Sequence, residues 1–487
     1  MGSARRLLHR TQGLARRPHS RWALLLVGAV GLIVAGVGAA LILRSEDPSS
    51  DRVTVTAGRD RPVNQDRVSV AAHNSPTIAQ SPTDTRRLVV ADKVDRPRFT
   101  ASLHVSNDGG RSWADVAFPT PRGEDRPYAP DLAWSADGTL FMAFVTLFGR
   151  GNSPGAVWTT SSRDGGRSWA RPRRVLGRYA FQVRLALDPG GNALYMTWLQ
   201  ATEDAISCVN CFAATGLPIL ASRSSDGGAS WTKPARVSAP DRERVGAPVP
   251  AVARTGELYV LYYDFKDDVF LWQNLQGAGY RGSYELVLSR GRPGTDAFRE
   301  ATVEPRVVPG ASFLVYLPEF PSLAFDHDRG TLYAAWADSR SGSRDAYLRR
   351  SNDGGRSWLE ATRINPSVER DQYLPRLSVA PGGRVDAAYL DRRDDPGNRL
   401  TAAYLAASYD AGRSWSSIAL SRRLFDSTVG PHTFLRGRLQ READQGTRLG
   451  LVSGRTASYA AWTDARRGNP TSGKLDILFA PISFERR

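Results

Sequence analysis

The chain has 487 residues, enough for two or three ordinary domains, and its 65 basic residues outnumber 49 acidic ones to give a formal net charge of +16. Its 45 glycines and 30 prolines suit a loop-rich all-β fold and stop short of a low-complexity composition. The basic charge favours a glycan or another anionic polymer as partner. No basic run interleaved with aromatic residues is present, so a nucleic-acid partner is not expected.

The N-terminal region has the features of a membrane anchor. Residues 1–21 contain six arginines and no acid and are predicted to be a cytoplasmic basic tail, whereas residues 22–43 carry no charge and are long enough for one transmembrane helix. Residues 44–66, rich in Asp, Arg, Ser and Pro, are predicted to be a tether. The expected location is the cell membrane, single-pass, with the remainder extracytoplasmic. A cleaved signal peptide, which would release a secreted protein, is the alternative.

An eight-residue motif, Ser-x-Asp-x-Gly-x-Ser-Trp, occurs five times in the rest of the chain. In each copy the aspartate can fold back onto backbone N–H groups, glycine supplies a positive φ, and tryptophan can bury its ring between flanking strands. The motif is therefore predicted to be a structural turn, and we call each copy an Asp box. Their aspartates are Asp108, Asp164, Asp226, Asp353 and Asp410.

The spacing of the boxes indicates a repeat architecture. Their tryptophans are about 60 residues apart, with one gap of roughly two periods, as repeats of supersecondary units would be. In that gap, Ser289 to Phe298 keeps a serine, a turn with glycine and proline, and a closing aromatic residue, but lacks the aspartate. A unit is therefore present there without a complete box.

Each unit contains four short alternating segments, which is typical of a propeller blade. We predict an all-β propeller of seven four-stranded blades over residues 67–487, with six blades as the alternative. The last unit ends after a third strand, so residues 52–57 or 67–72 are expected to supply its outer strand. The innermost strands are predicted near Thr77, Asp131, Val183, Pro250, Ser322, Arg376 and Gly450.

The two cysteines, Cys208 and Cys211, lie between the second and third segments of the third unit. Outside the cytoplasm, a disulfide that pins a long loop is the expected role. A redox pair is the alternative, because no second pair or nearby histidine completes a zinc site. The histidines His104, His327 and His432 show no ligand spacing and are predicted to be structural. No metal and no cofactor are expected.

A second repeat, aromatic-x-Asp-x-Arg, ends the second strand of three consecutive units. In a blade, the turns from second to third strand share one face with the blade-to-blade crossings, which we call the crossing face, while the Asp boxes lie on the other. Alternation would place the three side chains on one side of the strand end. The repeat comprises Trp336-x-Asp338-x-Arg340, Tyr389-x-Asp391-x-Arg393 and Trp462-x-Asp464-x-Arg466, with Asp264 in a weaker fourth copy.

These residues make the crossing face the candidate site. Arginines can bind a carboxylate in bidentate fashion, and buried acids beside them can serve as general acids. The alternative is that each Asp–Arg pair is only a salt bridge within its blade. The candidate catalytic residues are Asp338, Arg340, Asp391, Arg393, Asp464, Arg466, Glu319 and Tyr373, and the candidate substrate-binding residues are Arg184, Arg376, Asp264 and Tyr316.

The Asp boxes, their period and the strand pattern resemble the Asp-box repeats of the sialidase (neuraminidase) superfamily, from residue 70 to the C-terminus. That resemblance implies an arginine triad for the substrate carboxylate, an aspartate acid/base and a tyrosine nucleophile helped by a glutamate. It suggests Arg340, Arg393 and Arg466 as the triad, Tyr373 or Tyr316 as nucleophile, and Glu319 as helper. The chain departs from the family in lacking the Arg-Ile-Pro signature, and sialidases are typically six-bladed.

The sequence therefore predicts a membrane-anchored, extracytoplasmic, monomeric propeller that acts as a sialidase-like glycoside hydrolase on an anionic or sialylated glycan. The alternative is a non-catalytic propeller that binds a protein or a cell-envelope polymer.

Overall fold

The computed structural model describes residues 53–486, except for 192, 204–216, 243, 267–282, 296, 309–318, 367–368, 432–433, 436–437 and 440–444. The chain divides into two units, Met1–Asp51 and Arg52–Arg487. The first unit, with the predicted basic tail and transmembrane helix, lies outside the described residues. Within the described ranges, no helix is long and apolar enough to cross a membrane.

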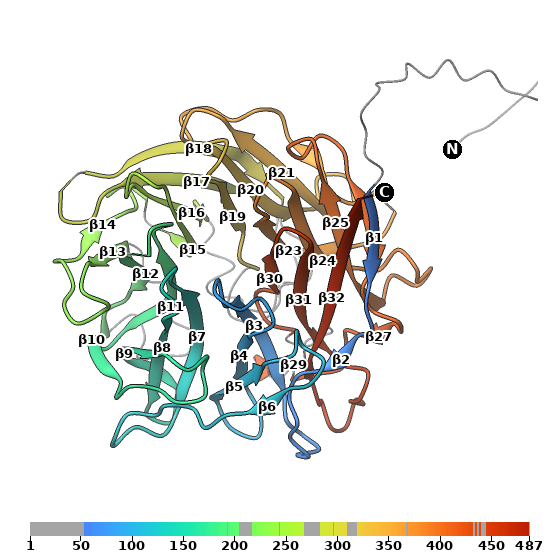
Figure 1. Ribbon diagram of the computed structural model, residues 1–487, viewed down its shortest axis with the longest axis horizontal. Helices are drawn as coiled ribbons and strands as arrows, with labels where there is room; N and C mark the ends of the chain where they lie inside the picture. The colour runs from blue at the N-terminus through green and yellow to red at the C-terminus, as the bar shows by residue number, and fades with distance from the viewer. Residues whose placement is uncertain are drawn as a thin grey trace, which may run out of the picture. The chain divides into compact units, whose positions relative to one another are not determined.

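Seven antiparallel sheets of four or five strands stand in a ring in the second unit (Figure 1). The first strand of each sheet is innermost, because the first strands of neighbouring sheets contact one another all around the ring. The predicted seven-bladed propeller is therefore confirmed, and the six-bladed alternative is wrong. The innermost strands include all seven positions at which the sequence placed them.

The blades follow one another in chain order, each from the centre outward. Blade 1 comprises β3 (His73–Gln80), β4 (Leu88–Val94), β5 (Thr100–Ser106) and β6 (Ala114–Asp115). Blade 2 comprises β7 (Pro127–Trp134), β8 (Leu140–Phe148), β9 (Ser153–Ser162) and β10 (Arg173–Leu176). Blade 3 comprises β11 (Ala180–Leu187), β12 (Leu194–Gln200), β13 (Ile219–Ser224) and β14 (Ala235–Arg236). Blade 4 comprises β15 (Val245–Val252), β16 (Leu258–Asp264), β17 (Tyr284–Gly291) and β18 (Arg299–Val307).

The last three blades complete the ring, and an additional short strand pairs within blade 6. Blade 5 comprises β19 (Ser322–Asp326), β20 (Thr331–Asp338), β21 (Asp345–Ser351) and β22 (Thr362–Arg363). Blade 6 comprises β23 (Gln372–Val379), β24 (Val385–Asp391), β25 (Leu400–Ser408) and β26 (Ser416–Ala419), with β27 (Phe425–Asp426) also paired to β25. A hairpin of β28 (Phe434–Leu435) and β29 (Arg438–Leu439) follows. Blade 7 comprises β30 (Gly450–Ser453), β31 (Ala457–Asp464) and β32 (Asp476–Arg486).

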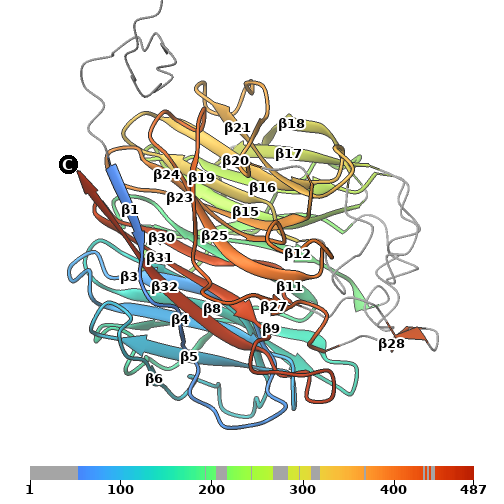
Figure 2. The same cartoon turned by 90° about the vertical axis from the view of Figure 1, so that its right-hand side faces the viewer.

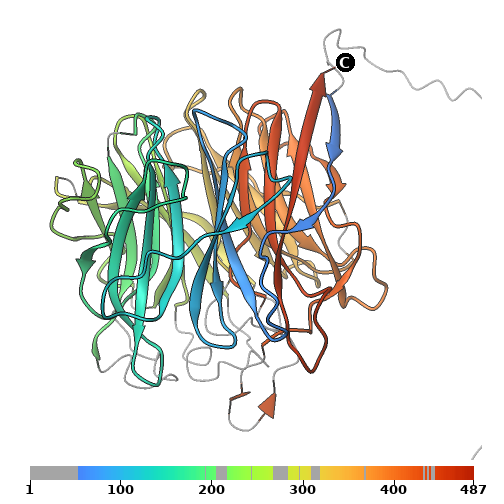
Figure 3. The ribbon, with the colours of Figure 1, turned by 60° about the horizontal axis from the view of Figure 1, so that its bottom comes forward.

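The N-terminal end of the second unit closes the ring. Strand β1 (Val53–Ala57) pairs antiparallel with β32, from Val53 opposite Arg486 to Ala57 opposite Ile482, and β2 (Arg61–Pro62) pairs with an earlier part of β32. Figure 3 shows β1 lying along β32. Of the two segments predicted to supply the outer strand of blade 7, residues 52–57 are therefore confirmed, rather than residues 67–72.

The hydrophobic core is divided among the blade interfaces. Seven clusters of buried apolar side chains lie one between each pair of neighbouring blades, including the pair of blades 7 and 1. Alternation along β4 shows how one strand contributes to two interfaces. Leu88 and Val90 face blade 7, while Val89 and Ala91 face blade 2. Since each blade has one apolar face for each neighbour, its strands contain long buried runs.

The Asp boxes form the turns from third to fourth strand with one repeated geometry. In the first box, Ser106 Oγ donates to Asp108 Oδ1 at 2.8 Å and accepts from the Gly110 N–H at 2.9 Å. The Ser112 N–H and hydroxyl donate to the two oxygens of Asp108 at 2.9 and 2.6 Å. The other four boxes repeat these contacts, so the motif is the turn that the sequence predicted.

Each box also packs against the preceding blade. Trp113 of blade 1 lies 5.2 Å from the Phe479 ring of blade 7, and the other box tryptophans contact the corresponding interfaces. In blade 4, which lacks a full box, Phe298 packs in the interface with blade 3 instead. The boxes therefore bind neighbouring blades together on one face.

The opposite face carries the crossings and the second-to-third turns, and Figure 2 shows the propeller from its side. The predicted disulfide between Cys208 and Cys211 falls between β12 and β13, outside the described residues.

Candidate functional site at the centre of the ring

The aromatic-x-Asp-x-Arg segments end β20, β24 and β31, as the sequence suggested. In blade 5, Asp338 accepts hydrogen bonds from the Trp336 indole N–H at 3.2 Å and from the Arg340 N–H at 2.9 Å. Blade 7 repeats this with Trp462, Asp464 and Arg466, and burial raises the pKa of the Asp464 carboxyl. Each aspartate thus stabilises the turn that follows its own strand by accepting these hydrogen bonds.

Each arginine of this repeat is neutralised inside its own blade. The Nε atoms of Arg340, Arg393 and Arg466 donate to the aspartates two residues earlier, at 2.9, 2.7 and 2.9 Å. Arg340 also lies 3.3 Å from Glu304, and Arg466 binds Asp60. Asp264 of the weaker copy pairs with Arg242. Within the described ranges, these residues make salt bridges within their own blades, to Glu304 of blade 4 in the case of Arg340, or to the N-terminal segment in the case of Arg466. Their contacts do not join the three arginines in one clamp.

Glu319 and Tyr373 lie close together without forming a hydroxyl–carboxylate pair. Glu319 accepts a hydrogen bond from the Leu374 N–H and lies 3.8 Å from Arg344, and burial raises the pKa of its carboxyl. The Tyr373 hydroxyl instead lies 3.0 Å from Thr401 Oγ1. Tyr316 lies outside the described residues.

The innermost strands share a third repeat, a β-bulge near the start of the strand. The pairing with the second strand shifts register at this point in blades 1, 2, 3, 4 and 6. At each bulge one non-glycine residue has a φ between 51° and 57°, namely Ser75, Ala129, Gln182, Ala247 and Leu374. Proline follows in all but blade 3. Bulges of this kind redirect the next side chain and often occur beside functional sites.

The redirected side chains form a charged cluster at the centre of the ring. Asp131 and Arg184 follow the bulges of blades 2 and 3, and Arg184 Nε lies 3.4 Å from Asp131 Oδ2. Asp131 also accepts hydrogen bonds from Thr77 Oγ1 at 3.2 Å and from the Leu185 N–H at 2.9 Å. Arg376 follows the bulge of blade 6. Five groups from four blades therefore meet here.

Arg448, just before β30 in blade 7, completes the cluster. Its Nη2 donates to the Pro130 carbonyl of blade 2 at 2.8 Å, so it reaches past the inner strand of blade 1. The Phe320 N–H of blade 5 donates to the Thr447 carbonyl beside it at 3.0 Å. The start of each inner strand follows a blade-to-blade crossing, so the cluster belongs to the crossing-face half of the ring.

Electrostatics show that this cluster has an excess of positive charge. Burial and the Arg184 charge lower the pKa of Arg376 to about 10, with Asp131 opposing the shift. Burial and the same neighbour lower the pKa of Arg448 to about 9, and Arg376 adds to the effect. Three guanidinium groups share one carboxylate here. Such mutual repulsion would be relieved by a bound anion.

Several guanidinium N–H groups of the cluster lack acceptors. Among the described residues, the Nε atoms of Arg184, Arg376 and Arg448 and the Nη1 atom of Arg184 are buried without a hydrogen-bond partner. Buried donors of this kind are rare in native proteins, since leaving one unsatisfied costs about 1–3 kcal/mol. The unsatisfied donors and the excess charge point to the same requirement, an anionic acceptor.

A tyrosine–carboxylate pair lies beside the arginines. The Tyr128 hydroxyl donates to Asp95, whose other oxygen accepts from Asn74 Nδ2 at 2.7 Å. Tyr128 interacts electrostatically with Arg448 and partly opposes the lowering of the Arg448 pKa. Tyr128 also precedes the bulge that carries Asp131. Lys93 Nζ lies 5.3 Å from the centroid of the Tyr128 ring. A partly exposed phenol thus stands between an acid and a group of cations.

Of this cluster, Arg184 and Arg376 were predicted from the sequence as candidate binding residues, and Asp131 was predicted only as part of an inner strand. Arg448, Tyr128 and Asp95 were not predicted. The recurring dipeptides Pro76-Thr77, Pro130-Asp131 and Pro375-Arg376 were the available signal. They mark equivalent positions in different blades, although the convergence of their side chains depends on the closed ring. Arg448 has no such signal, because its blade lacks the preceding proline.

Comparisons with known proteins give no family assignment. No family model matches the chain, and no curated protein matches it. A protein of unknown function from Dyadobacter fermentans is 12% identical, with a TM-score of 0.49 over 88% of this chain and 99% of its own. An α-L-arabinanase from Penicillium chrysogenum is 15% identical, with a TM-score of 0.46 over 76% and 98%. The endosialidase of phage phi92 is 10% identical, with a TM-score of 0.47 over 89% and 70%.

Proposed function

We propose that this protein is a glycan-active propeller that binds an acidic saccharide at the centre of its crossing face. The observation that carries the proposal is the cluster of Arg184, Arg376 and Arg448 around the carboxylate of Asp131, in which several buried guanidinium N–H groups have no hydrogen-bond partner in the part of the chain that the structure describes. An arginine fork presents parallel donors that fit a carboxylate or a sulfate in bidentate fashion. A uronic or sialic acid residue offers such a group on a rigid ring.

The rest of the site supports hydrolysis of a glycosidic bond. In the proposed reaction the Tyr128 oxygen attacks the anomeric carbon and Asp95 accepts the phenolic proton. The bond to the leaving sugar breaks, and that sugar takes a proton from a general acid. Water then attacks the glycosyl–tyrosine bond, giving its hydroxyl to the anomeric carbon and one proton to the carboxylate of the general acid. As that bond breaks, Asp95 returns its proton to the Tyr128 oxygen, so all three groups regain their starting state. Glu319 is the candidate general acid, since burial raises the pKa of its carboxyl.

Sialoside hydrolysis is the specific form of this proposal. It rests on the resemblance of the Asp boxes to the sialidase superfamily together with three arginines and a tyrosine–carboxylate pair at one place. The residues assigned here are Arg184, Arg376, Arg448 and Tyr128, in place of the strand-end arginines, which already pair with their own aspartates.

The experiment is an assay of the full-length protein in mild detergent against fluorogenic α-sialosides, uronosides and neutral glycosides. Turnover of an acidic glycoside is expected. Arg376→Ala should raise KM about tenfold to hundredfold, because it removes hydrogen bonds to a charged group worth about 1.5–3 kcal/mol. Tyr128→Phe should lower kcat with little change in KM. Arg413→Ala, an exposed change on the Asp-box face, is the matched control and should behave like the wild type.

The outcomes separate binding from catalysis. Saturable binding of an acidic saccharide without turnover would reject the hydrolase and keep the binding function. If Arg393→Ala weakened turnover of the acidic glycoside as much as Arg376→Ala does, the substrate would bind at the strand ends and not at the central cluster. Preference for neutral glycosides would contradict the proposal as a whole.

The proposed location is the outer side of a membrane, with residues 22–43 as the anchor. The uncharged stretch preceded by six arginines supports it. Alkaline extraction of membranes from producing cells should leave the protein in the pellet, and external protease should degrade the propeller. Recovery in the alkaline supernatant would reject the anchor.

A further inference from the structure

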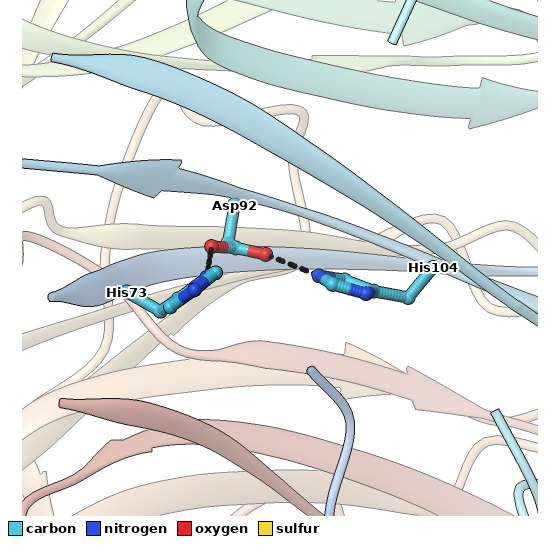
Figure 4. A group of neighbouring side chains, drawn as sticks. All are labelled: His73, Asp92 and His104. Atoms are coloured by element: carbon cyan, nitrogen blue, oxygen red, sulfur yellow. Dashed lines mark hydrogen bonds and ion pairs between the residues drawn. The ribbon is translucent and has the colours of Figure 1, made fainter. Parts of the chain in front are cut away.

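Two histidines and an aspartate from three strands of blade 1 meet in the interface with blade 7. His73 begins β3, Asp92 lies in β4, and His104 lies in β5 (Figure 4). His73 Nδ1 lies 2.7 Å from one oxygen of Asp92, and His104 Nε2 lies 2.9 Å from the other. All three side chains are at least 96% buried. One ligand atom of each lies within 4.8 Å of the other two.

The outer nitrogens of both imidazoles are held by further carboxylates. His73 Nε2 lies 3.1 Å from Asp66, and His104 Nδ1 lies 2.6 Å from Asp115. Metal-ligating histidines in proteins typically donate their second ring N–H to a carboxylate, which fixes the tautomer and the ring orientation. The inner nitrogen of each imidazole therefore faces Asp92, while the outer nitrogen is already bound to a carboxylate. This is the arrangement that a metal site needs.

The charge around the cluster also suits a divalent cation. The carboxylates of Asp66, Asp92 and Asp115 surround the two imidazoles. A divalent ion between the inner nitrogens and Asp92 would offset part of this negative charge.

We propose that His73 Nδ1, His104 Nε2 and the Asp92 carboxylate form a zinc-type metal site. Two imidazoles and one carboxylate suit zinc and neighbouring first-row metals rather than calcium or magnesium, which prefer oxygen ligands. Ser102 Oγ lies 3.2 Å from His73 Nδ1 and 3.0 Å from Asp92, so a fourth oxygen lies beside the three proposed ligands.

The position of the site indicates a structural role. Asp66 belongs to the N-terminal segment that follows β2, and Lys474 next to β32 lies 3.4 Å from Asp66. Asn64 donates to Asp66 and to Asp476 of β32. The metal would therefore fix blade 1 to the segment that closes the ring. The sequence did not reveal it, because His73, Asp92 and His104 are far apart in the chain and adjacent only across the sheet.

The experiment measures zinc on the full-length protein after removal of metal with a chelator. The protein is dialysed against Zn²⁺ or Mg²⁺ at pH 8, and bound metal is determined by mass spectrometry. About one zinc per chain and no magnesium are expected, with a higher Tm than with chelator. His104→Gln should bind no zinc. His327→Gln, a half-buried histidine in blade 5, is the matched control and should bind zinc as the wild type does.

A second variant covers the case in which His104→Gln fails to fold. Asp115→Asn keeps all three ligands and weakens only the hydrogen bond between residue 115 and the outer nitrogen of His104. Zinc affinity should therefore fall about tenfold to hundredfold. No zinc on the wild type, or equal zinc on the wild type and His104→Gln, would overturn the proposal and leave the cluster as a chain of ion pairs. Glycosidase activity is not used as a readout, so this outcome is independent of the proposed function.

Discussion

The Asp-box aspartate stabilises its turn as a carboxylate, and this makes its contribution depend on pH. Asp164 accepts hydrogen bonds from the Ser168 N–H at 2.9 Å and from the hydroxyls of Ser162 and Ser168. Hydrogen bonds from Ser168 and Ser162, partly opposed by burial, lower the pKa of Asp164 to about 2. Since the folded pKa lies below the unfolded value of about 4, the stabilisation is complete above pH 4 and is lost as pH falls toward 2.

Replacing Asp164 by alanine should therefore destabilise the propeller at neutral pH and have less effect in acid. The expected loss is about 1–2 kcal/mol at pH 7, since several hydrogen bonds are removed from a partly exposed turn. The difference from the wild type should shrink between pH 4 and pH 2.5. The free energy of unfolding of both proteins is measured at each pH by urea titration, with tryptophan fluorescence as the signal. A loss that stays constant over this range would show that the charge of Asp164 is not involved.

At the scale of the element, the motif glycine of the first Asp box is fixed by packing as well as by backbone conformation. Gly110 has a φ of 78°, and a Cβ there would come within 2.1 Å of the Phe479 ring in blade 7. Its neighbour Gly109 has a similar φ of 73°, but a Cβ there would meet only the Tyr459 hydroxyl, at 3.9 Å. The two positions thus share a conformational requirement and differ in contact with the preceding blade.

Alanine at these two positions should separate the two effects. Gly109→Ala should cost about 1–2 kcal/mol, the penalty for a side chain in the left-handed region. Gly110→Ala should cost that amount plus about 1–3 kcal/mol for displacing Phe479. The free energy of unfolding of both variants, measured side by side in urea, tests this. Equal losses would mean that the Phe479 ring moves aside without cost.

The elements also show what could be predicted from the sequence. The boxes, the alternation of the strands and the outer strand at residues 52–57 depend on local pattern and period. The first two were predicted outright, and the outer strand was predicted as one of two segments, the other being residues 67–72. The central cluster depends on bulges that redirect Asp131, Arg184 and Arg376 and on closure of the ring, which brings Arg448 from the other end of the chain. Local pattern instead favoured the aromatic-x-Asp-x-Arg repeat, whose arginines bind their own aspartates.

For the whole molecule, ring closure depends on a single strand from the opposite end of the chain. Strand β1 covers β32 and continues through β2 to Asn64, which accepts a hydrogen bond from the Ile477 N–H at 2.9 Å. Blades 1 to 6 are each made from consecutive strands, so blade 7 alone needs a distant segment. Loss of β1 would expose the edge of β32 along five paired residues.

Deletion of residues 1–57 should therefore give a folded but less stable propeller that self-associates, because an uncovered edge strand pairs with other chains. We expect a lower Tm and a concentration-dependent shift to dimers or larger species in gel filtration. Deletion of residues 1–51 removes the first unit and keeps β1, and the product should remain monomeric with the higher Tm. Thr56→Ala, at an exposed position of β1, should leave both properties unchanged. If both deletions had the same Tm and the same size, closure by β1 would not contribute to stability.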